Sequence, residues 1–342
     1  MALGKTEQND RDALMRSFLE HHGWGDRKPA FLAGDASNRT YYRITSSRGH
    51  TAVLMDAHEP TEKVPEFVQI DTLLQDMGYS APEILAYDLD NRFILLEDLG
   101  DQTFTYCLEK GMDRYELYQT ATEVIIDLHK NYKHTPSLNI PFYTLETYRR
   151  ECDAFLDWYY PSIFGATIAP TAQQEWGEIW NKILTTELSL PKTLVLRDFH
   201  VDNLLWLKNR KGIQRCGLLD FQDALIGSPA YDLVSLFEDA RLDVNADMTQ
   251  KLLNLYFSRF SDLDRDQFVK EYNILGAQRS AKIIGYFARL AIRDNKKRYL
   301  DFIPRTWKWL EKDLHHPALK EIKNWMDKYI LPEKRKVPNV TN

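Results

Sequence analysis

The chain has 342 residues, of which 44% are hydrophobic and 27% are charged, with 15 Gly and 14 Pro. This is the composition of a folded globular protein, and it excludes disordered, collagen-like and coiled-coil chains, while the length predicts two lobes rather than one core. The net charge of -6 argues against general nucleic-acid binding, which needs a net basic face.

The first hundred residues predict a sheet with one helix. Three short apolar runs indicate the strands of a β-meander, at residues 31–32, 41–44 and 51–55. Between Glu66 and Met77 the apolar residues recur at helical spacing, and Gly78 follows where a helix favours a left-handed residue. Residues 84–87 and 93–96 flank an Asp-Asn turn, which predicts a hairpin.

The rest of the chain is predicted to be mainly helical. Its first amphipathic helix carries apolar residues between Tyr118 and Leu128. The helical pattern is interrupted by three short apolar runs separated by polar loops, at residues 193–196, 204–206 and 217–219. Ser228 and Pro229 then supply the cap and first residue of a helix over residues 231–237.

The polar loops between these runs carry a pattern typical of phosphoryl transfer. Asp198 and Asn203 stand five positions apart, and Asp220 follows directly after the third run. One carboxylate has to orient the nucleophile and accept its proton, while an amide oxygen and a second carboxylate hold Mg²⁺ against the nucleotide phosphates. We therefore expect Asp198 to be the catalytic base, with Asn203 and Asp220 as metal ligands.

Several motifs along the chain resemble one family. The chain is similar to the aminoglycoside phosphotransferase-like branch of the protein-kinase fold, and within it to bacterial N-acetylmuramate/N-acetylglucosamine anomeric kinases. The matching residues are 34–39, 42–43, 54–57, 97–100, 197–200, 220–224, 231–236, 299–300 and 303–305. The resemblance implies an α+β bilobal fold, with a β-rich nucleotide-binding lobe over residues 1–97 and a mainly helical catalytic lobe over residues 98–342, using ATP and Mg²⁺.

The resemblance also implies roles for individual residues. Ser37, Asn38 and Arg39 would lie in the loop over the ATP phosphates, and backbone groups near Glu97 to Leu99 would receive adenine. Asp232 would brace the catalytic loop. His200, two residues after the expected base, is interpreted as a structural hydrogen-bonding residue of that loop, because Asp198 already supplies the proton acceptor.

Two features depart from the protein-kinase pattern. The phosphate loop is not the glycine-rich G-x-G-x-x-G, and residues 51–56 contain no lysine where protein kinases place one against the phosphates. The nearest cations that could balance the phosphate charge are Arg39, Arg43 and Lys63.

The acceptor is expected to be a small-molecule sugar. N-acetylmuramate carries a carboxylate, which favours an arginine partner, and Arg293 and Arg298 stand in a basic stretch near the end of the chain. Asp223 is a further candidate for substrate contact. An aminoglycoside or choline-type kinase of the same fold remains an alternative, as does a catalytically inactive pseudokinase, which the missing strand lysine suggests.

The sequence also indicates where the protein works. Three widely spaced cysteines, at positions 107, 152 and 216, show neither a disulfide framework nor a zinc spacing. The first ten residues are too polar for a secretion signal, and no apolar stretch is long enough to span a membrane. We therefore expect a cytoplasmic protein that has no nucleic-acid or membrane partner and needs no obligate protein partner.

Overall fold

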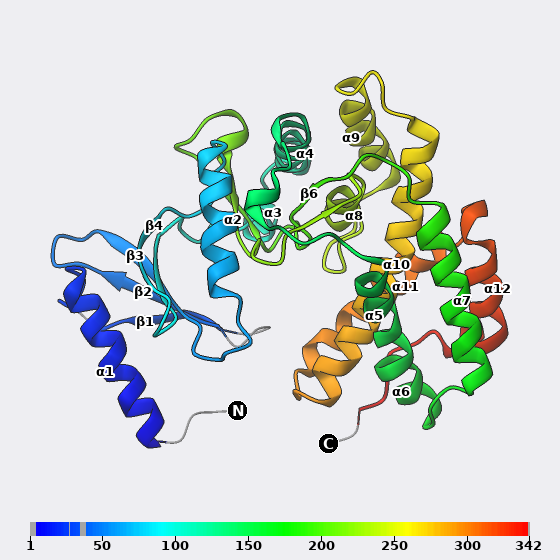
Figure 1. Ribbon diagram of the computed structural model, residues 1–342, viewed down its shortest axis with the longest axis horizontal. Coiled ribbons are helices and arrows are strands. Elements are labelled where there is room, and N and C mark those ends of the chain that lie inside the picture. The colour runs from blue at the N-terminus through cyan, green and yellow to red at the C-terminus, as the bar shows by residue number, and fades with distance from the viewer. Residues whose placement is uncertain (1–4, 27, 35–38, 341–342) are drawn as a thin grey trace. The chain divides into compact units, whose positions relative to one another are not determined.

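Figure 1 shows the computed structural model of the protein, which describes residues 5–26, 28–34 and 39–340. The chain divides into two compact units. Unit 1 comprises Met1–Asp113 and Asp202–Asp223, and unit 2 comprises Arg114–Val201 and Ala224–Asn342. The single boundary expected after residue 97 assigns residues 98–113 and 202–223 to the helical lobe, whereas this division groups both segments with the sheet.

Unit 1 is built on a five-stranded antiparallel sheet with the strand order β1-β2-β3-β5-β4. Its strands are β1 (Ala30–Ala33), β2 (Thr40–Thr45), β3 (Thr51–Asp56), β4 (Ile84–Asp88) and β5 (Phe93–Glu97). The predicted meander and the predicted hairpin are thus confirmed. Gly49 occupies the turn between β2 and β3 with a φ of 82°, a left-handed conformation that glycine adopts without a steric penalty.

The alternation of side chains along the central strands gives the sheet two different faces. Leu54 of β3 and Leu95 of β5 lie in a core with Met15 and Phe18 of α1 (Lys5–His21). The residues that alternate with Leu54 and Leu95 along the two strands point to the opposite face of the sheet. That face bears α2 (Val64–Asp76). Figure 1 shows α1 and α2 on opposite sides of the sheet. The predicted helix over residues 66–77 corresponds to α2, whereas α1 has no counterpart among the predicted elements.

The segment that returns to unit 1 from later in the chain forms a second, two-stranded sheet. β7 (Leu204–Trp206) pairs antiparallel with β8 (Cys216–Leu218). The connection between the two strands contains the 3-10 helix η3 (Gly212–Arg215). Bridges between Ser80 and Gly217 and between Thr103 and Leu205 fix this sheet to the first hundred residues and to α3 (Phe104–Glu109). The position of β7 and β8 therefore depends on the same unit that contains the larger sheet.

Unit 2 is mainly helical, as predicted, and contains one further pair of short strands. These strands are β6 (Thr193–Val195) and β9 (Leu225–Gly227). Its α-helices are α4 (Arg114–Asn131), α5 (Leu145–Ala154), α6 (Tyr160–Phe164), α7 (Pro170–Thr186), α8 (Tyr231–Phe237), α9 (Ala246–Ser258), α10 (Arg265–Ile292), α11 (Ile303–Asp313) and α12 (Lys320–Tyr329). Short helices are η1 (Pro136–Leu138), the π-helix η2 (Phe155–Tyr159), η4 (Lys297–Phe302), η5 (Pro317–Leu319) and η6 (Pro332–Lys334).

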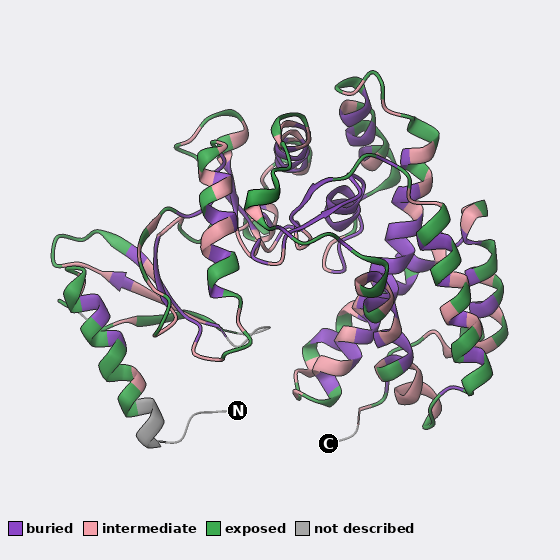
Figure 2. Cartoon of the chain, in the orientation of Figure 1, coloured by how far each residue is buried: buried purple, intermediate pink, exposed green. Residues whose placement is uncertain are grey.

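The long helix α10 is the centre of unit 2. Figure 2 shows that α8 and the middle of α10 are almost wholly buried. A Cβ atom on Gly285 would lie 2.3 Å from the carbonyl carbon of Ala154, so the backbones of α10 and the end of α5 are in direct contact there. This close packing fixes the position of α10 relative to α5. Among the residues that the structure describes, no helix is both long and apolar enough to cross a membrane.

Candidate active site

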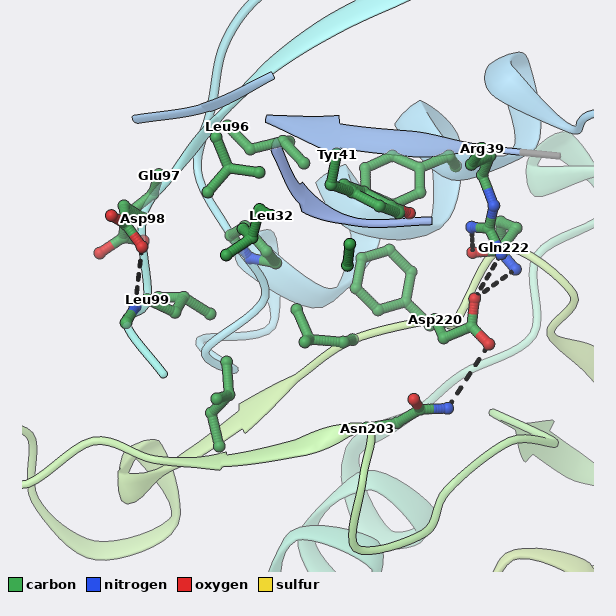
Figure 3. A pocket seen from close by; sticks show the side chains of 18 of the residues that line it. Leu32, Arg39, Tyr41, Leu96, Glu97, Asp98, Leu99, Asn203, Asp220 and Gln222 are labelled. Atoms are coloured by element: carbon green, nitrogen blue, oxygen red, sulfur yellow. Dashed lines mark hydrogen bonds and ion pairs between the residues drawn. The ribbon is translucent and has the colours of Figure 1, made fainter. Parts of the chain in front are cut away.

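A cavity of about 470 Å³ lies within unit 1, on the face of the large sheet that bears α2. Side chains of β1, β2, β3 and β5 line it together with residues on and after the β7–β8 pair. Figure 3 shows Glu97, Asp98 and Leu99 toward one end of this cavity, and Arg39, Asp220 and Gln222 at the other. The cavity therefore has an apolar middle with a different set of polar groups at each end.

Asn203 and Asp220 lie together at the polar end because the β7–β8 pair brings their segments together. Asn203 precedes β7, Asp220 follows β8, and the backbone N–H of Leu219 donates to the carbonyl oxygen of Asn203 at 2.9 Å. The side-chain amide nitrogen of Asn203 is 3.5 Å from Oδ2 of Asp220. Asp220 has a φ of 61°, an unusual conformation for a residue with a side chain.

Arg39 crosses the polar end of the cavity and contacts Asp220. Its Nη2 is 2.5 Å from Oδ1 of Asp220, its Nη1 donates to Oε1 of Gln222 at 2.7 Å, and its Nε is 3.2 Å from a carboxylate oxygen of Glu62. Arg39 is only 8% exposed. Burial opposes its charge, but Tyr41, Asp220 and Glu62 raise the pKa of Arg39 above its ordinary value, so the guanidinium stays ionised.

The two other cations considered for the phosphates also form ion pairs within unit 1. Arg43 forms ion pairs with Asp98 and Asp101. Lys63 is 2.7 Å from Oδ1 of Asp223, which is a cavity-lining residue. The expected substrate residue Asp223 therefore has a cationic partner at this end of unit 1. Of the three candidates, Arg39 is the one that lines the cavity.

The expected adenine-binding segment lies at the other end of the cavity. Glu97 ends β5, its backbone N–H donates to the carbonyl oxygen of Glu83 at 2.8 Å, and its carboxylate binds Arg210 at 2.5 Å. The carboxylate of Asp98 accepts from the backbone N–H of Gly100 and from Arg43, which holds the turn in which Leu99 lines the cavity. Ser37 and Asn38, expected in the phosphate loop, lie outside the described residues.

The loop that carries Asp198 belongs to unit 2, and a buried carboxylate holds it. Asp232, the second residue of α8, accepts hydrogen bonds from the backbone N–H groups of Leu196 and Arg197 at 2.7 and 2.8 Å. These bonds form directly before Asp198, where Arg197 has a φ of 74°. Burial raises the pKa of Asp232 to about 7, against the effect of the two hydrogen bonds. Asp232 thus fixes the backbone that presents Asp198.

His200 and the two expected substrate arginines lie in the same unit as Asp198. His200 is buried, and burial together with Arg241 and Arg279 lowers its pKa well below the usual value, so its ring is neutral. Arg293 caps the C-terminus of α10, binds Asp294 and has a side chain that is 55% exposed. Arg298 lies over the ring of Tyr299.

A buried network that the sequence did not predict lies beside Asp198. Glu151 of α5 is 1% exposed, forms ion pairs with Arg197 and Lys282, and accepts hydrogen bonds from Tyr143 and Gln278. Burial acts to raise its pKa, but Lys282 and Arg197 outweigh this effect and hold it at about 2. A charged residue such as Lys282 among the small and apolar residues of α10 was a signal, because a buried charge needs a partner.

Residues 29–269 match the model of the phosphotransferase enzyme family. The chain belongs to this family. Asp198, Asn203 and Asp220 all lie within the matched residues.

Two curated relatives match most of the chain. It is 34% identical to the N-acetylmuramate/N-acetylglucosamine kinase of Caulobacter vibrioides, over 97% of this chain and 100% of that protein. It is 33% identical to the protein of the same name from Pseudomonas aeruginosa, over 91% of this chain and 92% of that protein. The predicted resemblance to this group of kinases is therefore confirmed.

Solved structures confirm the predicted fold class. The ADP-bound aminoglycoside phosphotransferase APH(2″)-Ib superposes with a TM-score of 0.60 over 88% of this chain and 96% of its own. A choline/ethanolamine kinase family protein from Mesorhizobium loti superposes with a TM-score of 0.62 over 93% and 99%. Each is 14% identical to this chain, so these likenesses concern the fold alone.

Proposed function

We propose that the protein is an ATP-dependent kinase that phosphorylates the C1 hydroxyl of N-acetylmuramate, of N-acetylglucosamine or of both. The observation that carries the phosphoryl-transfer chemistry is the pair of Asn203 and Asp220 at the polar end of the unit 1 cavity. The two relatives named for these sugars support the acceptor, because they match nearly the whole chain at 33 to 34% identity.

The unit 1 cavity is proposed to hold ATP. The adenine ring would lie against the apolar middle, near the backbone of Glu97 to Leu99, and the phosphates would extend to Arg39. Arg39 would replace the strand lysine, because it is the cavity-lining cation and is fixed by Asp220, Gln222 and Glu62. A guanidinium presents several donors to phosphate oxygens in a rigid arrangement.

Asn203 and Asp220 fit a magnesium site. Mg²⁺ prefers oxygen ligands and is usually held by one or two protein groups together with phosphate oxygens and water, rather than by a cage of side chains. An amide oxygen and a carboxylate supply such a pair, and among the described residues no three His, Cys, Asp or Glu side chains gather into a metal site. When bound, the ion would neutralise charge on the nucleotide phosphates.

Asp198 is proposed to orient the C1 hydroxyl and to accept its proton. The hydrogen bonds from Leu196 and Arg197 to Asp232 hold its loop, and His200 is neutral and buried. Catalysis would rest mainly on positioning and on charge neutralisation, because phosphoryl transfer needs little covalent chemistry from the protein. Asp223 remains a proposed substrate contact.

We place the reaction in the cytoplasm, where ATP is available. Cys107, Cys152 and Cys216 are all buried and none forms a disulfide, which is consistent with a reducing compartment.

The proposal is tested by ADP release with Mg²⁺ and ATP against a panel of acceptors: N-acetylmuramate, N-acetylglucosamine, kanamycin and choline. We expect turnover with one or both amino sugars. Turnover with kanamycin or choline alone would keep the phosphotransferase chemistry but reject the sugar. Nucleotide binding without turnover of any acceptor would favour a catalytically inactive protein.

A further inference from the structure

One face of α10 carries a row of polar groups that begins beside the loop of Asp198. Gln278, Lys282, Tyr286 and Arg289 follow one another at intervals of four, four and three residues, which places them on one side of the helix. From Lys282 to Arg289 the row spans seven residues, or roughly 10 Å along the helix axis. We refer to these four residues as the α10 row.

The first part of the α10 row is tied to the catalytic loop. Lys282 is 7% exposed and its Nζ is 3.3 Å from Oε1 of Glu151, the carboxylate that also binds Arg197. Arg197 directly precedes Asp198. Two cations therefore share one ionised carboxylate at this point. Burial opposes the charge of both cations, but Glu151 and, more weakly, Asp198 raise the pKa of each, so the two cations are balanced by two carboxylates.

The far part of the α10 row holds an arginine that lacks a carboxylate. The guanidinium carbon of Arg289 lies 4.4 Å from the ring centroid of Tyr286. Arg289 is half-buried, its Nε is buried without a hydrogen-bond acceptor, and among the described residues no carboxylate forms an ion pair with it. Asp294, which follows the end of α10, is held by both Nε and Nη2 of Arg293, and its pKa is lowered mainly by Arg293 and only weakly by Arg289.

A half-buried guanidinium is stabilised by an anion, and a carboxylate matches its paired donors. Tyr286 lies between Lys282 and Arg289 in the row, and the cationic groups of both lie over its ring, at 5.9 and 4.4 Å from the centroid. A sugar whose C1 hydroxyl is at Asp198 would extend along such a row. Gln278 is fully buried, so the acceptor would meet the half-buried part of the row. We propose that Tyr286 and Arg289 of the α10 row bind the acceptor and that Arg289 receives the carboxylate of an acidic amino sugar.

This inference rests on the proposed function and deepens it, because it names the group that distinguishes N-acetylmuramate from N-acetylglucosamine. It replaces Arg293 and Arg298 in that role by Arg289. Arg293 lies four residues further along the chain than Arg289, is largely exposed and has Asp294 as its partner.

The test compares steady-state phosphorylation of the two sugars by wild type and by Arg289→Met. We expect KM for N-acetylmuramate to rise roughly tenfold to a hundredfold, because a charge-assisted hydrogen bond to its carboxylate would be lost. KM for N-acetylglucosamine, which has no carboxylate, should change little. Arg289→Lys keeps the charge but not the paired donors, and should have an intermediate effect. Turnover of the neutral sugar reports that each variant is folded.

Arg265→Met is the matched control, because Arg265 lies on the same helix and also sits over an aromatic ring, that of Phe257, but is about 25 Å away along the axis from Lys282. It should leave both sugars unchanged. Equal effects of Arg289→Met on the two sugars, or no effect, would overturn the inference. A selective loss with Arg293→Met instead would also overturn it. If wild type phosphorylates neither sugar, the proposed function itself fails and the inference falls with it.

Discussion

At the scale of single residues, Arg39 shows how unit 1 supplies a cation that its strand β3 lacks. In protein kinases the lysine of that strand pairs with a glutamate and contacts the phosphates. Here the residue directly before β2 pairs with Glu62 and reaches Asp220. The sequence predicts Arg39 as one of three candidates, and the folded arrangement separates it from Arg43 and Lys63, because of the three it is Arg39 that lines the cavity.

We predict that Arg39→Met lowers kcat/KM for ATP by about a hundredfold or more, because a buried cation that faces the phosphates would be lost. Arg39→Lys should recover part of this loss. Arg48→Met is the control, since Arg48 is exposed in the turn between β2 and β3. Kinetics at varied ATP concentration provide the measurement. Wild-type values for Arg39→Met would show that another group balances the phosphate charge.

At the scale of elements, α2 carries a buried acid whose protonation should affect stability. Asp71 is 1% exposed, and one of its carboxyl oxygens has no hydrogen-bond partner among the described residues. Burial, with a smaller contribution from Glu97, raises the pKa of Asp71 to about 8. Because the folded pKa is above the unfolded value, the protonated form stabilises the fold at low pH, and this contribution is lost as pH rises toward 8.

The free energy of unfolding of Asp71→Asn, relative to that of wild type, should therefore rise by about 1 kcal/mol or more between pH 5 and pH 9. Chemical denaturation of both proteins at several pH values measures this difference. An identical pH dependence in the two proteins would mean that Asp71 has an ordinary pKa in the fold.

The contact between α10 and α5 gives a second prediction at this scale. A Cβ atom on Gly285 would lie 2.3 to 2.5 Å from backbone atoms of Ala154 and Phe155. Backbone atoms cannot move aside as the end of a flexible side chain can. Gly285→Ala should destabilise the protein by about 2 kcal/mol or more, although alanine favours helices. The same substitution at Gly177 of α7 should cost much less, because the nearest atoms to its Cβ would be those of the Arg149 side chain, at 3.1 to 3.6 Å, rather than backbone atoms.

Thermal unfolding of the two glycine variants tests this contrast directly. Equal stability of Gly285→Ala and Gly177→Ala would show that α10 and α5 can separate at little cost. Gly285→Ala should also lower catalytic activity. Lys282 of α10 and Arg197 of the Asp198 loop both bind Glu151 of α5, so a displacement of α10 from α5 would disturb that loop.

The elements differ in how far the sequence could predict them. Strands β2, β3 and β5 and helix α2 were predicted because their apolar periodicity and their turn residues agree. Helix α1 was not predicted, since its sequence is mostly polar and, among its described side chains at residues 9–21, Met15, Phe18 and Leu19 are the buried ones. In the candidate site, the spacing of Asp198, Asn203 and Asp220 was visible in the sequence. The pairing of Glu151 with Lys282, 131 positions apart, depends on helix packing, which no local pattern encodes.

At the scale of the whole molecule, unit 1 is discontinuous in sequence. The cavity needs Asn203 and Asp220 from the returning segment, and Phe221 of that segment packs against Phe67 of α2 with ring centroids 5.1 Å apart. Thr105 also donates a hydrogen bond to Asp202, the first residue of the segment. The single boundary expected after residue 97 therefore separates groups that one fold holds together.

A fragment of residues 1–113 should bind ATP at least tenfold more weakly than the full chain and should unfold without cooperativity. Joining residues 202–223 to it through a short flexible linker should restore much of the cooperativity, because Asp202 already contacts Thr105. Circular dichroism and ATP titration compare the two fragments. Equal behaviour would mean that the returning segment contributes little to unit 1.

The central claim is that Asp198 promotes transfer of a phosphoryl group to C1 of an amino sugar. The most direct measurement is phosphorus NMR of the product formed from ATP and N-acetylmuramate labelled with carbon-13 at C1, by wild type and by Asp198→Asn. We predict a phosphorus signal coupled to the labelled carbon with wild type, and a rate about 10²- to 10⁴-fold lower with the variant. A phosphate on another carbon, or an undiminished rate with Asp198→Asn, would contradict the claim.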